Sequence, residues 1–287
     1  MKYRVSRGVP SLLLATLMWG STFPLIKLLT HNLTPLAYVS YRSMIASLPL
    51  LPFIILIRPS FRLLTAGFSL GLLYFLGLYI QAIGITYTTS SNAAFITSFS
   101  VPLVYLLEVI FLKRKPSAYL TLSVVTATLG ILLLSLNPNR SPGSTLGDVI
   151  TLLSTVIWAV QVILVDIYSK KYKTLPLTAL ELVSSGAVGV TTYYVLPSLH
   201  NEVNVSLPTL QILIYLSLVG SVIACTLQVY GQRSTSSTQA AIIYTLEPVF
   251  ATLFASKILG ENLHGQQYLG ATLILISLYM ASINRRT

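Results

Sequence analysis

The feature that most constrains this chain is a series of ten apolar stretches, each about as long as a bilayer-spanning helix. A helix needs roughly 20 consecutive apolar residues to cross the hydrocarbon core. Only 9% of the residues are charged, whereas a soluble domain carries roughly 25%. The sequence therefore predicts an all-α integral membrane protein with ten transmembrane helices. The expected spans cover residues 9–29, 35–57, 64–85, 92–112, 118–136, 147–169, 175–196, 208–229, 238–258 and 266–284.

The basic residues predict how these spans are oriented. A net charge of +11 alone would also suit a nucleic-acid-binding protein. If the N-terminus is inside and the spans alternate, 14 of the 18 Lys and Arg fall in inner segments. Only Lys27, Arg140 and Lys257 fall on the outer side, and Arg42 lies within a span. This asymmetry follows the positive-inside rule, so we expect a plasma-membrane protein with both termini cytoplasmic and no nucleic-acid partner.

Two halves of the chain share a pattern. The segments 91–117 and 238–270 each open with a double alanine and carry a proline within the apolar run. Matched residues recur at nearly constant spacing, which indicates an internal duplication. Spaced by 147 are Gln81/Gln228, Gly84/Gly231 and Ala94/Ala241; by 146, Pro102/Pro248; and by 139, Trp19/Trp158, Lys27/Asp166 and Arg42/Glu181.

The segment 137–144, rich in Pro, Ser, Asn and Gly, has the composition of a linker. It divides the chain into residues 1–138 and 139–287, with five expected spans in each part. Because five is odd, the second part enters the membrane from the opposite face. The sequence thus predicts two inverted five-helix repeats, an arrangement typical of transporters.

The acidic residues are few, and their depth separates them. Glu108, Asp148 and Asp166 lie near the ends of expected spans, where we expect their side chains to reach water. Glu202 and Glu261 fall in expected outer loops. Glu181 lies deeper, and Glu247 lies near mid-depth beside Pro248. Intramembrane carboxyls mark functional sites by default, so Glu247 is the first candidate proton carrier and Glu181 the second. The alternative for Glu247 is a permanently protonated group that bonds a neighbouring helix.

Arg42 stays charged in a protein and is either an anion-binding group or half of an ion pair. It and Glu181 fall in opposite thirds of the membrane, so we expect no contact between them. Gly20 and Pro24 predict a break in the first span. We expect a cavity lined by spans 1, 3, 4, 6, 8 and 9, with spans 5 and 10 outside it. Its candidate polar and aromatic residues are Trp19, Ser21, Tyr79, Gln81, Trp158, Gln161, Gln228 and Tyr244, for which interhelical bonding or plain packing is the alternative role.

Other classes of protein find little support. The chain has no H-E-x-x-H pair, no G-x-S-x-G elbow and no Walker A loop, so we expect neither an enzyme nor a built-in ATPase. Cys225 is the single cysteine, and the three histidines, His31, His200 and His264, fall in expected outer loops. We therefore expect no catalytic residues, no metal site and no cofactor.

A known family shares these features. The inverted five-plus-five arrangement, Trp19-Gly20-Ser21 in the first span, Leu246-Glu247-Pro248-Val249-Phe250 in the ninth and the following Leu259-Gly260-Glu261 resemble the drug/metabolite transporter superfamily, EamA type. The first half departs from that pattern, because Lys113-Arg114-Lys115 stands where the second half has Gly260-Glu261. The resemblance implies one EamA repeat per half and export of small metabolites such as amino acids.

These observations lead to one expected function and its alternatives. We expect a secondary-active transporter, an exporter of amino acids or drug-like compounds, that works by alternating access and is coupled to protons. Its partners would be a small-molecule substrate and membrane lipid, with no ATPase subunit, and it would act as a monomer or homodimer. An uncoupled facilitator, channel or lipid scramblase is the alternative, followed by an intramembrane enzyme.

The predicted topology can be tested by cysteine labelling. With Cys225 replaced, a cysteine at position 140 should react with an impermeant thiol reagent added outside intact cells, because that loop is expected on the outer face. Cysteines placed at Lys113 or Lys171 should react only after the cells are opened. Labelling of position 140 from the inside alone would contradict the topology.

Overall fold

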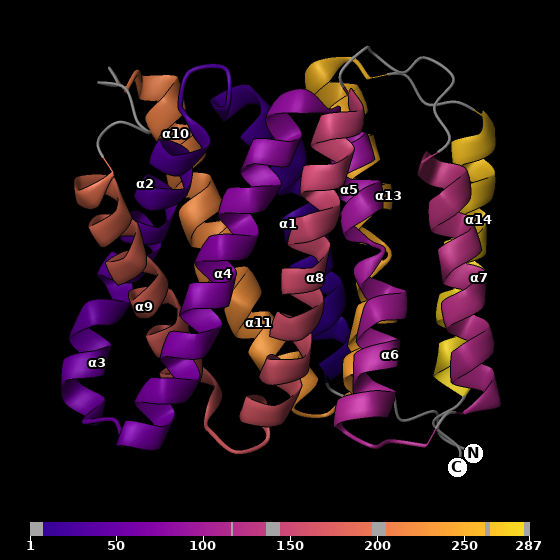
Figure 1. Cartoon of the computed structure of the whole chain (residues 1–287), viewed down its shortest axis with the longest axis horizontal. Helices are drawn as coiled ribbons and strands as arrows, with labels where there is room; N and C mark the ends of the chain where they lie inside the picture. The colour runs from indigo at the N-terminus through magenta and orange to yellow at the C-terminus, as the bar shows by residue number, and fades with distance from the viewer. Residues whose placement is uncertain (1–7, 116, 136–143, 197–204, 262–264, 284–287) are drawn as a thin grey trace.

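The computed structural model describes residues 8–115, 117–135, 144–196, 205–261 and 265–283, and these residues are almost entirely helical. The helices stand side by side and run between two opposite faces (Figure 1). In chain order they are α1 (Gly8–Leu29), α2 (Pro35–Ser47), η1 (Leu48–Leu50), α3 (Leu51–Ile57), α4 (Phe61–Tyr87), α5 (Ser90–Thr97), α6 (Ser100–Phe111), α7 (Ala118–Ser135), α8 (Ser144–Ser169), α9 (Thr174–Val195), α10 (Leu207–Ser217), η3 (Leu218–Ile223), α11 (Ala224–Gln232), α12 (Ser237–Tyr244), α13 (Glu247–Leu259) and α14 (Gly265–Ile283).

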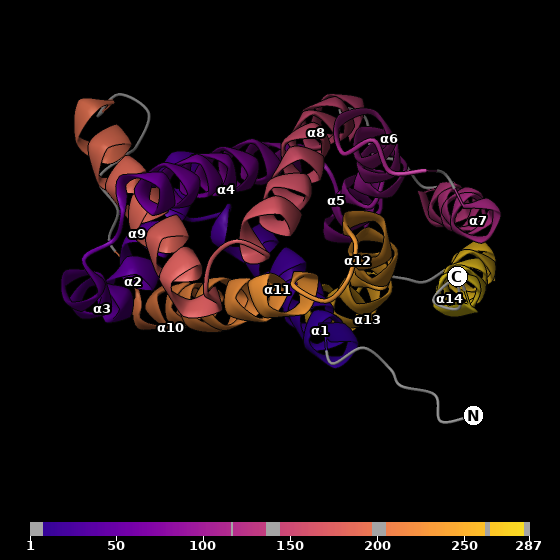
Figure 2. The same ribbon diagram turned by 90° about the horizontal axis from the view of Figure 1, so that it is seen from below.

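We name the two faces by the helices that begin there. The α5 face is the upper one in Figure 1, where α5 begins and α13 ends, and the α12 face is the lower one, where α12 begins and α6 ends. Seen from below, α7 and α14 lie together at one side of the molecule (Figure 2), and they pack on each other. The α7 helix also packs on α5, α6 and α12, and α14 on α12.

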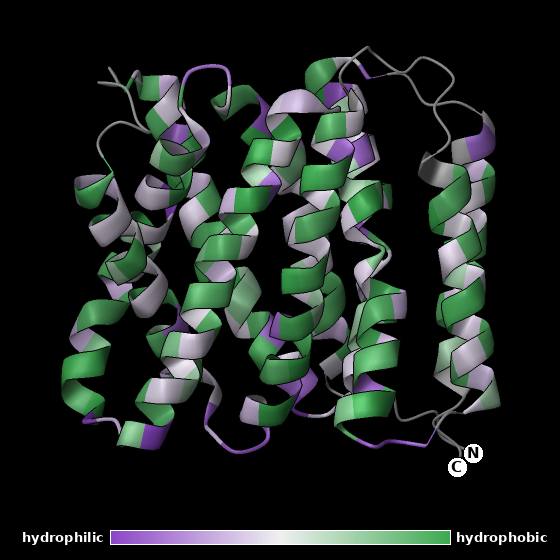
Figure 3. Cartoon of the chain, viewed as in Figure 1, coloured by the Kyte–Doolittle hydropathy of each residue, from purple (hydrophilic) through white to green (hydrophobic). Residues whose placement is uncertain are grey.

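Eight helical stretches are long and apolar enough to span a membrane. Their sides are hydrophobic and the hydrophilic residues gather toward the two faces (Figure 3). Within the described ranges, two shorter apolar helices at 118–133 and 268–281 accompany them. The chain is therefore an all-helical, multi-pass membrane protein. The eight are Gly8–Leu29, Pro35–Ile57, Phe61–Tyr87, Ser90–Phe111, Thr145–Ser169, Thr174–Val195, Leu207–Gln232 and Ser237–Leu259.

Four of these stretches are not single regular helices. Between α5 and α6 the helix is interrupted at Ser98–Phe99, and between α12 and α13 at Thr245–Leu246, which lies 147 residues further on. In both places a proline follows within four residues, and proline lacks the N–H that would continue the preceding turn. The second stretch changes to the 3₁₀ turn η1, which contains Pro49, and the stretch 207–232 contains the π-helical turn η3.

The break predicted in the first span is absent, because α1 runs without interruption through Pro24. Two hydroxyl groups just before the proline bond carbonyls of the preceding turn: Ser21 Oγ donates to Met18 O at 2.6 Å and Thr22 Oγ1 to Trp19 O at 2.7 Å. The α1 backbone also lies against α13 at Gly20. These hydroxyls bond carbonyls other than that of Gly20, which the missing N–H of Pro24 would have bonded, and α1 stays helical through Pro24 where it packs on α13.

Close approach of helices depends on glycine at a few positions. A Cβ atom added to Gly71 of α4 would lie 2.3 Å from the carbonyl oxygen of Glu181 in α9. One added to Gly84 would lie 2.2 Å from Thr151 Oγ1 in α8. Small residues allow such backbone contact between membrane helices, so α4 packs directly on both α8 and α9.

Replacing Gly71 with alanine should destabilise the protein. The new methyl group would collide with the α9 backbone, and overpacking of this kind costs about 1–3 kcal/mol. We expect a lower unfolding temperature in detergent micelles, measured by tryptophan fluorescence. Gly265→Ala is the matched control, because a Cβ there meets no described atom within 4 Å. Equal unfolding temperatures for the two variants would contradict this account of the α4–α9 contact.

Candidate functional site

A cavity of ≈ 70 Å³ lies inside the bundle. The described residues that line it come from α1, α2, α4, α5, α6, α8, α11, α12 and α13. These include all six of the spans that the sequence placed around a cavity, and α2 is added because Arg42 reaches inward. No described lining residue belongs to α7, α9 or α14. The interruptions at Ser98–Phe99 and Thr245–Leu246 bring short helix ends to this cavity.

Glu247 reaches the cavity as the first residue of α13, directly after the interruption. Within the described chain its carboxyl has no hydrogen-bond or ion-pair partner, and it lines the cavity with Tyr244. Tyr244 packs edge-on against Trp19, with ring centroids 5.3 Å apart. An acidic side chain at a helix N-terminus is favoured by the helix dipole. Glu247 is thus an available carboxyl on the cavity wall.

Arg42 lines the same cavity although it is almost fully buried, with 1% of its surface exposed. Its guanidinium donates to four neutral acceptors, and none of its described partners is a carboxylate. They are Tyr38 Oη at 2.6 Å, Ser221 Oγ at 2.9 Å, the Gly220 carbonyl at 3.1 Å and Tyr74 Oη at 3.3 Å. Burying a charge is costly unless it is paired, so this cation lacks the counter-charge that would offset its burial.

The π-helical turn η3 supplies two of the acceptors around Arg42. Gly220 O accepts from Arg42 Nη2 and also from Trp19 Nε1, at 3.1 Å in each case. A Cβ on Gly220 would lie 2.9 Å from Thr22 Cγ2 and 3.0 Å from Arg42 Nη2, so a larger residue here would displace these side chains. π-Helical turns often occur at functional sites. Sequence reasoning missed η3 because no proline marks it, and the only local signal is the small pair Gly220-Ser221.

A row of amides connects the cavity to a deeply buried carboxyl. Gln161 and Gln228 both line the cavity and form a reciprocal pair, with Nε2–Oε1 distances of 3.0 and 3.3 Å. Gln161 Nε2 also donates to Glu181 Oε1 at 3.0 Å. Glu181 is 0% exposed, and its Oε2 has no hydrogen-bond partner among the described residues. Glu181 therefore lies behind the cavity wall and contacts it through Gln161.

The remaining predicted site residues divide into two groups. Trp158 lines the cavity, and its Nε1 is buried without a described partner. Gln81 lines it as well and donates to Thr97 Oγ1 at 3.1 Å. Ser21 and Tyr79 are not among the described residues that line this cavity. Ser21 bonds the hydroxyl of Tyr215 at 2.8 Å, and Tyr79 stacks on the ring of Phe75 with centroids 6.4 Å apart.

Three carboxylates expected to reach water make contacts within the protein, and two of them are buried. Glu108 and Asp166 are 4% and 1% exposed and belong to an ion-pair network at the α12 face. Asp148 accepts from Thr88 Oγ1 at 2.8 Å and from the amide of Asn92. These residues lie near helix ends, as their positions in the expected spans predicted. Position in a span does not reveal the neighbouring cations and amides. Position 140, His200, Glu202 and His264 lie outside the described residues.

The cavity combines one buried cation, one available carboxyl, paired amides and an unpartnered indole N–H. Such a set suits a small polar solute that carries both a negative and a positive group, since each charge would meet its opposite.

The described residues contain no group of three or more His, Cys, Asp or Glu placed to hold a metal ion.

Comparison with known proteins agrees with this architecture. A transporter of unassigned substrate from Archaeoglobus fulgidus is 32% identical over 274 residues, covering 95% of this chain and 84% of its own. The "Probable amino-acid metabolite efflux pump" of Escherichia coli K12 is 26% identical over 93% of this chain and 92% of its own. The inner membrane transporter YedA of the same strain is 25% identical over 94% and 88%.

A crystal structure 14% identical in sequence superposes with a TM-score of 0.77 over 97% of both chains, which shows that the fold is shared. The model of the EamA-like transporter family matches this chain twice, over residues 6–136 and 145–283. The family and its named members are transporters rather than enzymes. Together the two matches cover nearly the whole chain, and the chain therefore belongs to the EamA-like transporter family.

Proposed function

We propose that this membrane transporter is a secondary-active exporter of small zwitterionic metabolites, amino acids among them, in the plasma membrane. The observation that carries the proposal is the pair of opposite groups on one cavity, Arg42 and Glu247. A carboxylate on the solute would supply the counter-charge that Arg42 lacks, and an ammonium group would meet Glu247. The relative named as an amino-acid metabolite efflux pump supports the export of amino acids. The relative named as an inner membrane transporter supports the plasma-membrane location.

We further propose ten spans in two inverted repeats, residues 1–138 and 139–287, although the boundary itself lies outside the described residues. The helix contacts support this arrangement, because they occur in matched pairs. The contact of α4 with α8 corresponds to that of α11 with α1, and the contact of α4 with α9 to that of α2 with α10. The packing of Gly84 on Gly147 likewise corresponds to that of Gly231 on Gly8.

The orientation is proposed from charge. Described basic residues cluster at the α12 face, which supports a cytoplasmic α12 face and an outer α5 face. Both termini would then be cytoplasmic. Those described residues are Arg58, Arg62, Lys113, Arg114, Lys115, Lys170, Lys171, Lys173 and Arg233.

Glu247 is the proposed proton carrier. With no nucleotide-binding motif in the sequence, the energy for uphill export would come from a gradient. In alternating access the two repeats rock so that the cavity opens to one side at a time. A carboxyl on the cavity wall can then release a proton on one side and take one up on the other. Coupling requires that the protonated and solute-bound forms favour different conformations.

Glu247→Gln should abolish proton movement that depends on substrate, because an amide cannot titrate. The measurement uses proteoliposomes with an imposed pH gradient and an internal pH dye, with candidate amino acids added outside. Glu181→Gln is the matched control, since Glu181 is buried but lies outside the cavity lining. If only the Glu181 variant loses proton coupling, Glu181 is the carrier. If the Glu247 variant moves protons with substrate at the unmodified rate, the uncoupled facilitator becomes the better description.

Arg42→Gln should weaken substrate binding by about 2 kcal/mol or more, the usual cost of removing one member of a buried charge pair. Binding is measured as the rise in unfolding temperature that amino acids produce in the purified protein. Arg42→Lys keeps the charge but loses the planar fork of donors, and should bind at intermediate strength. Arg62→Gln, at an exposed position on α4, should bind as the unmodified protein does. Unchanged binding in Arg42→Gln would exclude the proposed carboxylate contact.

A further inference from the structure

Each of the two short helices that follow a chain reversal begins with a pair of hydroxyl residues. For α5 these are Ser90-Ser91 and for α12 Ser237-Thr238, and the two pairs are 147 residues apart. In both helices a carboxylate from the other half of the chain accepts from at least one backbone N–H of this pair. Helix N-termini leave such groups unsatisfied and favour negative charge, so each carboxylate stabilises the start of a helix to which it is not covalently adjacent.

At the α5 face this carboxylate is Glu261. Its Oε1 accepts from Ser90 N and its Oε2 from Ser91 N, both at 3.2 Å, and Oε2 also accepts from Ser91 Oγ. Gly260 ends α13 with a left-handed φ of 69°, which glycine adopts readily. Glu261 follows directly and contacts α5. Thus the end of α13 is joined to the beginning of α5.

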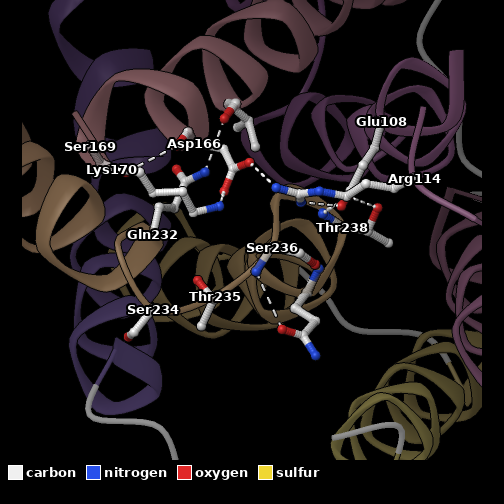
Figure 4. A network of polar contacts seen from close by, with 12 residues as sticks. Glu108, Arg114, Asp166, Ser169, Lys170, Gln232, Ser234, Thr235, Ser236 and Thr238 are labelled. Carbon is white, nitrogen blue, oxygen red and sulfur yellow. Dashed lines mark hydrogen bonds and ion pairs between the residues drawn. The ribbon is translucent and has the colours of Figure 1, made fainter. Parts of the chain in front are cut away.

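At the α12 face the carboxylate is Glu108, within the last turn of α6. Its Oε2 accepts from Thr238 N at 2.6 Å and from Thr238 Oγ1 (Figure 4). Its Oε1 pairs with Arg114, which also donates to Asp166 at 2.9 Å, and Asp166 pairs with Lys170. Burial lowers the pKa of Arg114, but Glu108 and Asp166 raise it by more, so the guanidinium stays charged. The ends of α6 and α8 are thereby joined to the beginning of α12.

The starts of α5 and α12 are stabilised by carboxylates at different sequence positions of the two halves. Lys113 and Gly260 are 147 residues apart and both have left-handed backbones, with φ of 51° and 69°. The residues that follow them, Arg114 and Glu261, are therefore equivalent. A cation cannot accept from helix N–H groups, so Arg114 cannot do what Glu261 does. It instead holds Glu108, which comes from a different position and makes the equivalent contact.

We propose that Glu108 and Glu261 are positioning residues for transport, each of which closes one face of the cavity by holding the short helix of the opposite half. The proposal rests on the proposed alternating-access function. Ser91 and Thr238 are buried within the protein, and a buried backbone N–H without a partner is costly. Either contact therefore breaks only when water reaches that helix start, which happens as that face opens. Opening at the α12 face requires loss of the Glu108–Thr238 contacts, and opening at the α5 face requires loss of the Glu261–Ser91 contacts.

The test measures access to the cavity from each face and needs no substrate. A cysteine replaces Ser100, which lines the cavity, in a protein with Cys225→Ala. Its rate of reaction with a small impermeant methanethiosulfonate is measured in right-side-out and inside-out vesicles. Glu108→Gln should raise the rate several-fold from the α12 face alone, and Glu261→Gln should raise it from the α5 face alone. Each variant is thus the matched control of the other.

Milder variants guard against a simple folding defect. Thr238→Val and Ser91→Ala remove only a hydroxyl donor and should shift access in the same directions as Glu108→Gln and Glu261→Gln, respectively. Each should add little when combined with the glutamine variant of its own face. Lys171→Gln, at an exposed position on the same face, changes a residue outside the described ion pairs and should leave the rate unchanged. Changes that are equal at both faces, or absent, would overturn the proposal.

The two proposals can fail separately. One-sided changes in access without movement of any amino acid would support the positioning role and count against the proposed substrate. Amino-acid transport that continues with unchanged cavity access in both glutamine variants would support the proposed function and exclude the role of Glu108 and Glu261.

Discussion

The structure depends on one constraint, which is that backbone polar groups inside a bilayer must find partners within the protein. Unbroken helices meet it by themselves, but this chain interrupts several of its helices beside the cavity. At two helix starts on the faces of the bundle, and at one turn beside the cavity, a charged side chain bonds backbone groups. Glu261 does so at the start of α5, Glu108 at the start of α12, and Arg42 at the carbonyl of Gly220 in η3. These charged residues are therefore partners of the backbone, and Arg42 is also a candidate ligand of a solute.

Much of the fold followed from the apolar pattern alone, because the length of a span is set by the thickness of the bilayer. The helical stretches begin and end within a few residues of their expected limits. Local breaks were harder to predict. Pro248 marks the start of a new helix, whereas Pro24 lies inside α1 where that helix packs on α13, and interrupts nothing. The π-helical turn η3 depends on its contact with Arg42, which is distant in sequence, and so carries almost no local signal.

Candidate site residues could be predicted where their position within a span marks them. They could not be predicted where only contacts with residues distant in sequence mark them. Glu247 stood out as a carboxyl near mid-depth, Arg42 as a charged residue within a span, and the matched glutamines by their repeat spacing; all of them line the cavity. Tyr74 and Ser221 contact Arg42 but look like ordinary span residues in the sequence. The expectation that the side chains of Glu108 and Asp166 reach water was wrong, because it left out their contacts. Residues near a helix end can reach water, yet Arg114 holds both of these carboxylates inside.

Under the proposed alternating access, the glycines of α4 have a consequence for how the two halves would move. Gly67 and Gly71 lie against the backbone and Cβ atoms of α9, and Gly84 lies against α8. A smooth contact of this kind has few interlocking side chains to disengage, which favours shear, the small sliding of packed helices past each other. Rearrangement along α4 would then cost little in side-chain repacking. The barrier between conformations would lie mainly in the polar contacts at the two ends of the bundle, so those contacts would set how fast the protein interconverts.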